Sequence, residues 1–136
     1  MTPREKQLIR ESFVSIREVA GPLSLLFYGR LFAMEPGVRP LFQNDIAKQG
    51  MKLMEMLTAV VENIDQVEEL TPVLQAMGQR HAGYGVLPAH YAMVEAALLW
   101  SLGQALGAAL DAEGKAAWRK VIGVVSQKMQ EGARAS

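Results

Sequence analysis

The sequence predicts a single all-α domain, and three observations support that prediction. Apolar residues recur at helical spacing in several segments, most regularly at Leu53, Leu57, Val60, Val61 and Ile64. No segment shows the alternating pattern of a convincing strand. Glycine and proline fall between the helical segments, where they end one helix and begin the next. The chain has 136 residues, which is enough for one domain over residues 1–136 with a core of its own.

The composition excludes several classes of function. Fourteen basic residues balance 14 acidic ones, so we expect neither nucleic acid nor an anionic membrane as partner. The chain has no cysteine, which excludes disulfides, thiolate nucleophiles and iron–sulfur clusters. The amino terminus lacks the apolar core of a signal peptide, and the most apolar run, residues 96–110, is expected to be too short to span a bilayer. We therefore expect a soluble cytoplasmic protein.

The first two helices have clear boundaries in the sequence. Thr2 and Glu5 form a capping box, and Pro3 takes the first helical position. Gly21 and Pro22 end this helix and begin the second. Because the second helix is apolar nearly all round, it is predicted to be buried.

The middle of the chain alternates between breaks and a strongly periodic helix. The sequence Glu-Pro-Gly at residues 35–37 ends the second helix, and a polar loop then runs to about Ala47. The helix with the Leu53 stripe follows. Residues 63–70 are expected to form a polar connection to the next helix.

Three more helices are predicted in the second half of the chain. Thr71 and Pro72 are expected to cap the first of them, and Pro88 begins a long apolar one. Asp111 is the expected cap of the last helix. The tail, residues 132–136, is expected to be frayed.

The most informative stretch for chemistry is residues 79–91, which contains both histidines. His81 lies near the end of a helix, on the same face as Leu74 and Met77. An imidazole among apolar neighbours is difficult to charge, and a neutral imidazole is suited to the single protein ligand that a haem iron needs. The alternative, a core histidine with a satisfied hydrogen bond, is the commoner case for an isolated histidine. His90 lies in the first turn of a helix and is expected either at the surface or as a neighbour of the site, not as a metal ligand.

Four short motifs in register make the chain similar to bacterial single-domain globins, the group that includes the haem domain of flavohaemoglobins and the short bacterial haemoglobins. They are Leu-Phe-Tyr-Gly-Arg-Leu-Phe at residues 26–32, Val-Arg-Pro-Leu-Phe at residues 38–42, Gln49, and Arg-His at residues 80–81 followed by Pro-Ala-His-Tyr at residues 88–91. The resemblance covers nearly the whole chain, from Thr2 to Met129. It implies the globin fold, a three-on-three helical sandwich around haem b (iron protoporphyrin IX).

The resemblance also implies a role for each matched residue. His81 is the proximal ligand of the iron, and Phe42 stacks on the porphyrin. Tyr28 and Gln49 lie on the distal side, where a phenol hydroxyl and an amide N–H each stabilise a bound diatomic gas by about 1–3 kcal/mol. The other residues expected around the haem are the apolar Leu53, Val86 and Leu98, and the cationic Lys52 and Arg80 beside the propionates.

Ordinary structural roles are the alternative at these same positions. Tyr28 could be a buried tyrosine bonded to a backbone carbonyl, Gln49 a surface glutamine and Phe42 a core phenylalanine. Lys52 and Arg80 could be solvated charges. The aliphatic residues would belong to the core of any helical fold.

The chain departs from flavohaemoglobins behind the proximal histidine. In that family a tyrosine and a glutamate polarise the histidine. The tyrosine matches Tyr91, whereas the position of the glutamate falls on Ala133. The nearest acid, Glu131, points in another direction on a helix. The full relay is therefore expected to be absent or rearranged. Because this relay makes the iron ligand more basic and favours oxygen activation, its absence would argue against strong peroxidase-like or dioxygenase chemistry.

The resemblance implies two functions. The first is reversible binding of oxygen for storage or transport, with NO and CO as further gas ligands. The alternative is nitric oxide dioxygenation, which detoxifies NO to nitrate and would make the protein an enzyme. We expect no flavin or nicotinamide domain after residue 136, so the expected redox partner is an external reductase. A sensor module and a haem-free helical protein are less favoured, because no output domain is attached and both His81 and Phe42 are present.

Overall fold

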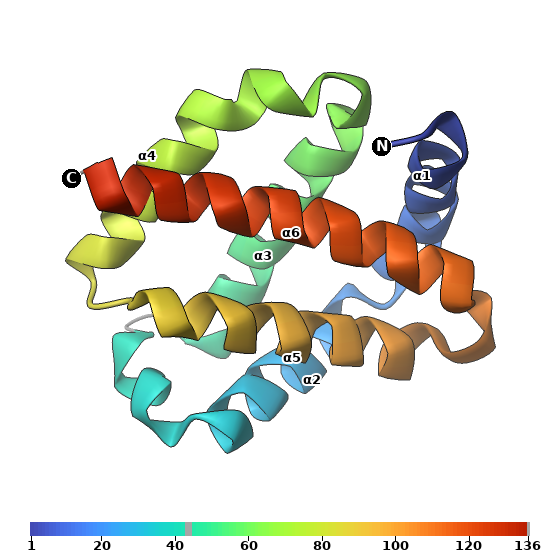
Figure 1. The fold of residues 1–136 in the computed structure, drawn as a ribbon. Helices are drawn as coiled ribbons and strands as arrows, with labels where there is room; N and C mark the ends of the chain where they lie inside the picture. Colours follow the sequence, from blue (N-terminus) through green and yellow to red (C-terminus); the bar gives the residue numbers. More distant parts are fainter. Residues whose placement is uncertain (43–44, 136) are drawn as a thin grey trace.

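A computed structural model shows an all-α chain and describes residues 1–42 and 45–135 (Figure 1). The elements in chain order are α1 (Pro3–Glu18), α2 (Ala20–Met34), the 3-10 helix η1 (Pro36–Leu41), α3 (Ile46–Glu62), the 3-10 helix η2 (Ile64–Leu70), α4 (Thr71–Gly83), α5 (Pro88–Leu106), the 3-10 turn η3 (Gly107–Ala109) and α6 (Ala112–Ala135). The described residues contain no strand, so the predicted all-α class is confirmed.

The last helix organises the packing. α6 crosses α4 and α1 and runs beside α5, while α2 packs against α5 and α3 (Figure 1). The core between these helices includes Trp118 on α6, which is fully buried. Its indole Nε1 donates a hydrogen bond of 2.8 Å to Ser12 Oγ on α1, which satisfies the one polar atom of the ring.

Most of the helix boundaries lie where the sequence predicts them. Thr2 Oγ1 accepts a hydrogen bond of 3.1 Å from the backbone N–H of Glu5, and the Glu5 carboxylate accepts one of 2.8 Å from the Thr2 N–H. This reciprocal pair is the predicted capping box. Pro88 begins α5, and Asp111 Oδ1 accepts a hydrogen bond of 2.8 Å from the Gly114 N–H at the start of α6.

The prediction that Thr71 caps α4 from outside the helix is wrong. Thr71 is the first residue of α4 and has helical dihedral angles, φ −49° and ψ −50°, whereas a capping residue is extended. The reason is that η2 leads directly into α4, so no extended residue separates them. Residues 63–70 are therefore not a simple polar connection, and Ile64 within them is buried in the core.

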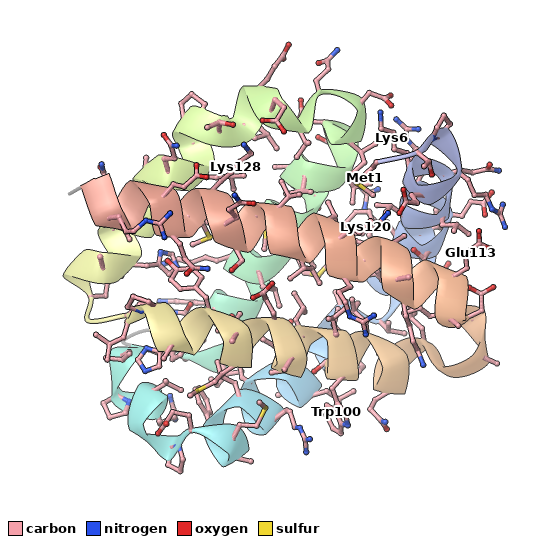
Figure 2. All side chains as sticks on the ribbon, in the orientation of Figure 1. Met1, Lys6, Trp100, Glu113, Lys120 and Lys128 are labelled. Atoms are coloured by element: carbon pink, nitrogen blue, oxygen red, sulfur yellow. The ribbon has the colours of Figure 1, made fainter. Side chains whose placement is uncertain are left out.

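The C-terminal segment is more ordered than expected. α6 continues to Ala135, and Gly132 is buried against α4, so the prediction of a frayed tail is wrong for this residue; Ser136 lies outside the described residues. Lys128 on α6 is labelled in Figure 2, and its Nζ forms an ion pair of 2.8 Å with Glu68 in η2. Packing against α4 and η2 therefore extends the helix beyond what the sequence pattern indicates.

Two glycines allow the backbones of α4 and α6 to touch. A Cβ atom at Gly78 would lie 1.8 Å from the carbonyl oxygen of Met129, and one at Gly132 would lie 2.0 Å from the carbonyl oxygen of Gln75. Only glycine fits at both places, because neither backbone oxygen can move aside. This crossing fixes the position of α4, the helix that carries His81.

One stretch among the described residues, Pro88–Ala109, is long and apolar enough to cross a membrane by length and composition alone. It has 22 residues, and its most apolar window of 18 residues has a mean hydropathy of 1.3. The run that was expected to be too short, residues 96–110, lies almost entirely within this longer stretch, which extends it toward Pro88. A core helix of a globular domain has the same character, and α5 packs against both α2 and α6.

Candidate functional site

Tyr28 is buried in α2 and faces α3. Its side chain is 5% exposed, and its hydroxyl donates a hydrogen bond of 3.0 Å to the backbone carbonyl of Gln49. Burial raises the pKa of Tyr28, so the phenol remains a protonated donor. A hydrogen bond to a backbone carbonyl is the ordinary structural role that is the alternative for Tyr28. A contact between Tyr28 and a gas ligand stays a prediction.

The tight approach of α2 and α3 explains this hydrogen bond. Gly50, next to Gln49, packs against Ser24, which lies one turn before Tyr28. A Cβ atom at Gly50 would lie 2.7 Å from Ser24 Oγ. Since only a glycine fits there without a shift of Ser24, the two helices come close enough for the Gln49 carbonyl to reach the Tyr28 hydroxyl.

Phe42 lies in the segment after α2 and packs against Tyr28. It is half-buried, and its ring centroid lies 5.5 Å from that of Tyr28 and 5.4 Å from that of Phe32, both in edge-to-face geometry. Its neighbour Leu41 reaches the turn after α4, where a Cβ atom at Gly85 would lie 3.3 Å from Leu41 Cδ2. The Phe42 segment therefore contacts both the Tyr28 side and the His81 side of the site.

α3 connects the two sides. The Asp45 carboxylate caps it by accepting a hydrogen bond of 2.9 Å from the Lys48 N–H. Gln49 and Leu53 follow one turn apart and are both half-buried, and the Gln49 amide forms no hydrogen bond among the described residues. Lys52 is exposed, and its charge lies close enough to His81 to lower the pKa of the imidazole.

His81 presents one ring nitrogen with its lone pair free. Nδ1 lies 2.7 Å from the carbonyl oxygen of Met77, one turn earlier on α4. A carbonyl can only accept, so Nδ1 carries the proton and Nε2 keeps the lone pair. Burial lowers the pKa of His81, and the charges of Arg80 and Lys52 lower it further, although the bond to Met77 acts in the opposite direction. The imidazole is therefore held in its neutral form.

The turn after α4 fixes the backbone around His81. α4 ends at Gly83, and Gly85 has a φ of +97°, which glycine adopts without strain. The carbonyl of His81 accepts hydrogen bonds of 3.0 Å from the N–H groups of both Tyr84 and Val86. These bonds hold Val86, which is half-buried, in a fixed relation to the histidine.

These features fit a haem better than a bare metal ion. The described residues contain no group of three or more His, Asp or Glu side chains that could hold an ion, so His81 offers only one nitrogen ligand. A single ligand suffices when a porphyrin supplies the others. A porphyrin also needs apolar surface, and Phe42, Leu53 and Val86 remain half-buried, whereas Leu98, at 2% exposed, belongs to the closed core.

Comparison with known proteins decides the family. The family model for globins matches residues 25–129. The chain belongs to the globin family. Globins bind haem and diatomic gases.

Two curated relatives resemble this globin along most of its length. A neuroglobin from Tetraodon nigroviridis is 28% identical, over 97% of this chain and 92% of the neuroglobin. A flavohaemoprotein from Bacillus subtilis is 27% identical over 88% of this chain, which corresponds to 31% of the flavohaemoprotein. The predicted similarity to the haem domain of flavohaemoglobins is thus confirmed.

Solved structures confirm the predicted globin fold. An engineered carbene transferase from Rhodothermus marinus, built on a candidate nitric oxide dioxygenase, superposes with a TM-score of 0.88 at 24% identity, covering 99% of this chain and 94% of that one. A bacterial globin from Campylobacter jejuni superposes with a TM-score of 0.85 at 22% identity, covering 98% of this chain and 97% of that one.

The region behind His81 differs from the relay of a tyrosine and a glutamate that the resemblance to flavohaemoglobins implies. Tyr91 is 7% exposed, and its hydroxyl has no hydrogen-bond partner among the described residues. Glu131 instead accepts a hydrogen bond of 3.3 Å from the Gln75 amide on α4. Ala133, which occupies the expected glutamate position, lines a cavity together with Tyr91. Neither Tyr91 nor His81 is therefore bonded to a carboxylate in the described part of the chain.

Replacing Tyr91 with phenylalanine is expected to stabilise the protein. A buried hydroxyl without a partner costs about 1 kcal/mol or more, and phenylalanine removes it without changing the ring. Urea unfolding of the haem-free protein should show an increase of about 1 kcal/mol in the free energy of unfolding. Tyr84→Phe is the matched control, because Tyr84 is 58% exposed and should give no change. A loss of stability in Tyr91→Phe would mean that the hydroxyl has a partner after all.

Three contributions to the site were not predicted from the sequence: those of Gly78, of Gly132 and of the Met77 carbonyl. Gly78 lies three residues before His81 on the same face of α4, and a glycine inside a predicted helix is a signal for a close helix contact. The sequence gives no comparable signal for Gly132, which lies in the tail that was expected to fray. The role of the Met77 carbonyl follows from the helical offset of four residues but requires the observed rotamer of His81.

Proposed function

We propose that this protein is a cytoplasmic haem globin that binds oxygen reversibly. The observation that carries the proposal is the state of His81: its Nδ1 is bonded to the Met77 carbonyl, and its neutral ring keeps a lone pair on Nε2. This is the arrangement that an iron ligand requires, because the second ring nitrogen must be deprotonated and correctly oriented.

The other residues at the site would hold a haem b between α3 and α4. Phe42, Leu53 and Val86 supply apolar contacts, and the cationic side chains of Lys52 and Arg80 are exposed and available to the propionates. When bound, the haem iron supplies the position at which a diatomic gas binds. Haem binding buries the apolar edges that these side chains leave open.

The partner of His81 favours reversible binding over oxygen activation. The Met77 carbonyl is a neutral acceptor, and a neutral acceptor makes the imidazole a weaker electron donor than a carboxylate would. A weaker donor gives less electron density for breaking the O–O bond. The location of Glu131, bonded to Gln75 away from Tyr91, supports the same conclusion.

The distal pair would control the rate of gas release. Gln49 has an amide that is free to donate, and Tyr28 has a hydroxyl whose single proton is shared with the Gln49 carbonyl at 3.0 Å. A gas ligand with a partly negative outer atom would compete with that carbonyl for the proton. Tyr28 would then retain the gas less strongly than a tyrosine with no other acceptor.

Replacing Tyr28 with phenylalanine tests this proposal. The variant is expected to release oxygen about tenfold faster, because a hydrogen bond in a dry pocket worth about 1.4 kcal/mol is lost. The measurement is stopped-flow oxygen dissociation from the ferrous protein. Tyr84→Phe removes an exposed hydroxyl and should leave the rate unchanged. An equal rate in Tyr28→Phe and the wild type would exclude a distal role for Tyr28.

Nitric oxide dioxygenation is the alternative, and the similarity to a flavohaemoprotein favours it. This reaction combines NO, O2 and one electron to give nitrate, so it needs a reductase as the electron source. Sustained nitrate formation over many turnovers with a cellular reductant would establish an enzyme. A single oxidation for each haem, followed by arrest, would leave reversible binding as the function.

A further inference from the structure

Helices α2 and α5 carry far less charge than α1 and α6. α2 has 15 residues and α5 has 19, and each contains a single Asp, Glu, Lys or Arg. By comparison, α1 and α6 contain seven such residues each. A helix with one face open to water normally carries polar or charged residues on that face. The open sides of α2 and α5 are therefore unusual for a surface that only meets water.

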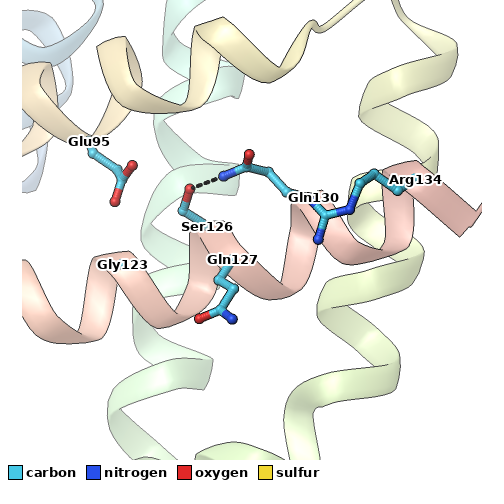
Figure 3. Close-up of a pocket in the computed structure, with 6 residues that line it drawn as sticks. All are labelled: Glu95, Gly123, Ser126, Gln127, Gln130 and Arg134. Atoms are coloured by element: carbon cyan, nitrogen blue, oxygen red, sulfur yellow. Dashed lines mark hydrogen bonds between the residues drawn. The ribbon is translucent and has the colours of Figure 1, made fainter.

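The one charge on each of these helices is directed at a neighbouring helix. Figure 3 shows the Glu95 carboxylate projecting from α5 toward α6, and a Cβ atom at Gly123 on α6 would lie 3.8 Å from Glu95 Oε1. Arg30 extends from α2, and its guanidinium carbon lies 4.7 Å from the centroid of the Trp100 ring on α5, which is a cation–π contact. The side of α5 that points away from α6 therefore presents no charge of its own.

The open sides of the two helices adjoin each other. The contact between Arg30 and Trp100 joins them, and Figure 2 shows Trp100 on the side of α5 that lies away from α6. The most apolar window of 18 residues in Pro88–Ala109 is only 22% buried, so much of this helix remains uncovered. What we call the α2–α5 face consists of six exposed residues: Ala33 and Met34 on α2, and Ala92, Ala96, Trp100 and Gln104 on α5. The four on α5 recur every four residues and so lie in one row.

We propose that the α2–α5 face binds the same face of a second copy of this chain, which gives a dimer with two-fold symmetry. In such a dimer each face meets its own equivalent, so a face rich in charge of one sign would repel itself. The α2–α5 face has none among its six residues, and the whole chain has a formal net charge of zero. Tryptophan and methionine are enriched at protein interfaces, and Trp100 is the natural anchor of this one.

The size of the face fits a weak dimer. With 19 residues, α5 is about 28 Å long, and two helices packed about 8–10 Å apart present a strip about 20 Å wide. This gives roughly 550 Å² on each copy and about 1,100 Å² for the pair, just below the range of about 1,200–2,000 Å² for stable complexes. The dimer goes beyond the proposed function and does not depend on haem, because neither His81 nor Tyr28 belongs to the face.

Sedimentation velocity of the purified haem-loaded protein tests the proposal. We expect monomers at about 1 μM and dimers at about 500 μM, with a Kd on the order of 10 μM. A monomer at every concentration would overturn the proposal. A lipid bilayer is the alternative occupant of an apolar face, so the protein is also mixed with vesicles of uncharged phosphatidylcholine. A protein that sediments with the vesicles but stays monomeric without them would overturn the dimer in favour of a lipid surface.

Variants locate the interface. Ala96→Glu is expected to weaken dimerisation by about tenfold or more, because each copy would bring an unpaired carboxylate into the contact. Trp100→Ala should weaken it by a similar factor, because the anchor is lost. Ala116→Glu is the matched control: Ala116 is an exposed alanine on α6, outside the face, so the same added charge should leave the Kd unchanged. Equal dimerisation in the wild type, Ala96→Glu and Trp100→Ala would place the interface elsewhere and would also overturn the proposal.

Discussion

Replacing His81 with alanine is expected to abolish retention of haem while the helical fold remains. The side chain is the one described nitrogen donor at the site with a free lone pair, so its loss should weaken haem affinity by more than about 100-fold. The Soret absorbance of the purified variant, relative to its protein absorbance, measures this directly. Circular dichroism should show an unchanged helix content, because His81 lies in the last turn of α4 and is only half-buried.

His90 provides the control, because it is the only other histidine in the sequence. Its Nδ1 accepts a hydrogen bond of 3.0 Å from the Leu87 N–H and caps α5. His90→Ala should therefore retain haem and lose only about 1 kcal/mol of unfolding free energy. Added imidazole should restore a ferrous spectrum with a fifth ligand to His81→Ala. A Soret band of normal strength in His81→Ala without imidazole would disprove the proposed cofactor site.

Replacing Gly78 with alanine is expected to have the largest effect on stability of any single methyl addition in this chain. The new Cβ would lie 1.8 Å from the Met129 carbonyl oxygen, so α4 and α6 must separate along their crossing. Overpacking of this kind lowers the free energy of unfolding by about 3 kcal/mol, because a clash with a backbone atom cannot be relieved by a change of rotamer. The displacement also moves His81, one turn further along α4, so haem affinity should fall together with stability.

Gly83→Ala on the same helix is the matched control. No atom lies within 4 Å of a Cβ at this position, and alanine should stabilise the helix by up to about 1 kcal/mol. Gly132→Ala should behave like Gly78→Ala, since its Cβ would lie 2.0 Å from the Gln75 carbonyl. The double variant Gly78→Ala/Gly132→Ala should lose less unfolding free energy than the two single variants lose together, because the first change already separates the helices. Unfolding in urea measures the free energy of unfolding of all four variants. Strictly additive losses for Gly78→Ala and Gly132→Ala would contradict a shared contact between the two glycines.

The sequence by itself determined the helices and the candidates for the site. The Thr2–Glu5 capping box, Pro88 and Asp111 are local signals, and each begins a helix where it was predicted. His81 could be singled out because its apolar neighbours share its helical face. These features depend on residues within about one turn of each other, so the chain needs no distant partner to define them.

Only the tertiary structure decided what the chemical groups are bonded to. The Tyr28 hydroxyl donates to a carbonyl on α3 that is 21 residues away in the sequence. The Glu131 carboxylate accepts from the amide of Gln75 on α4, which is 56 residues away. The contact between α4 and α6 also joins distant glycines, and it orders a tail that the sequence pattern alone indicates to be frayed. The physical reason is that hydrogen bonds and close backbone contacts depend on sub-ångström positions of helices, which sequence periodicity does not define.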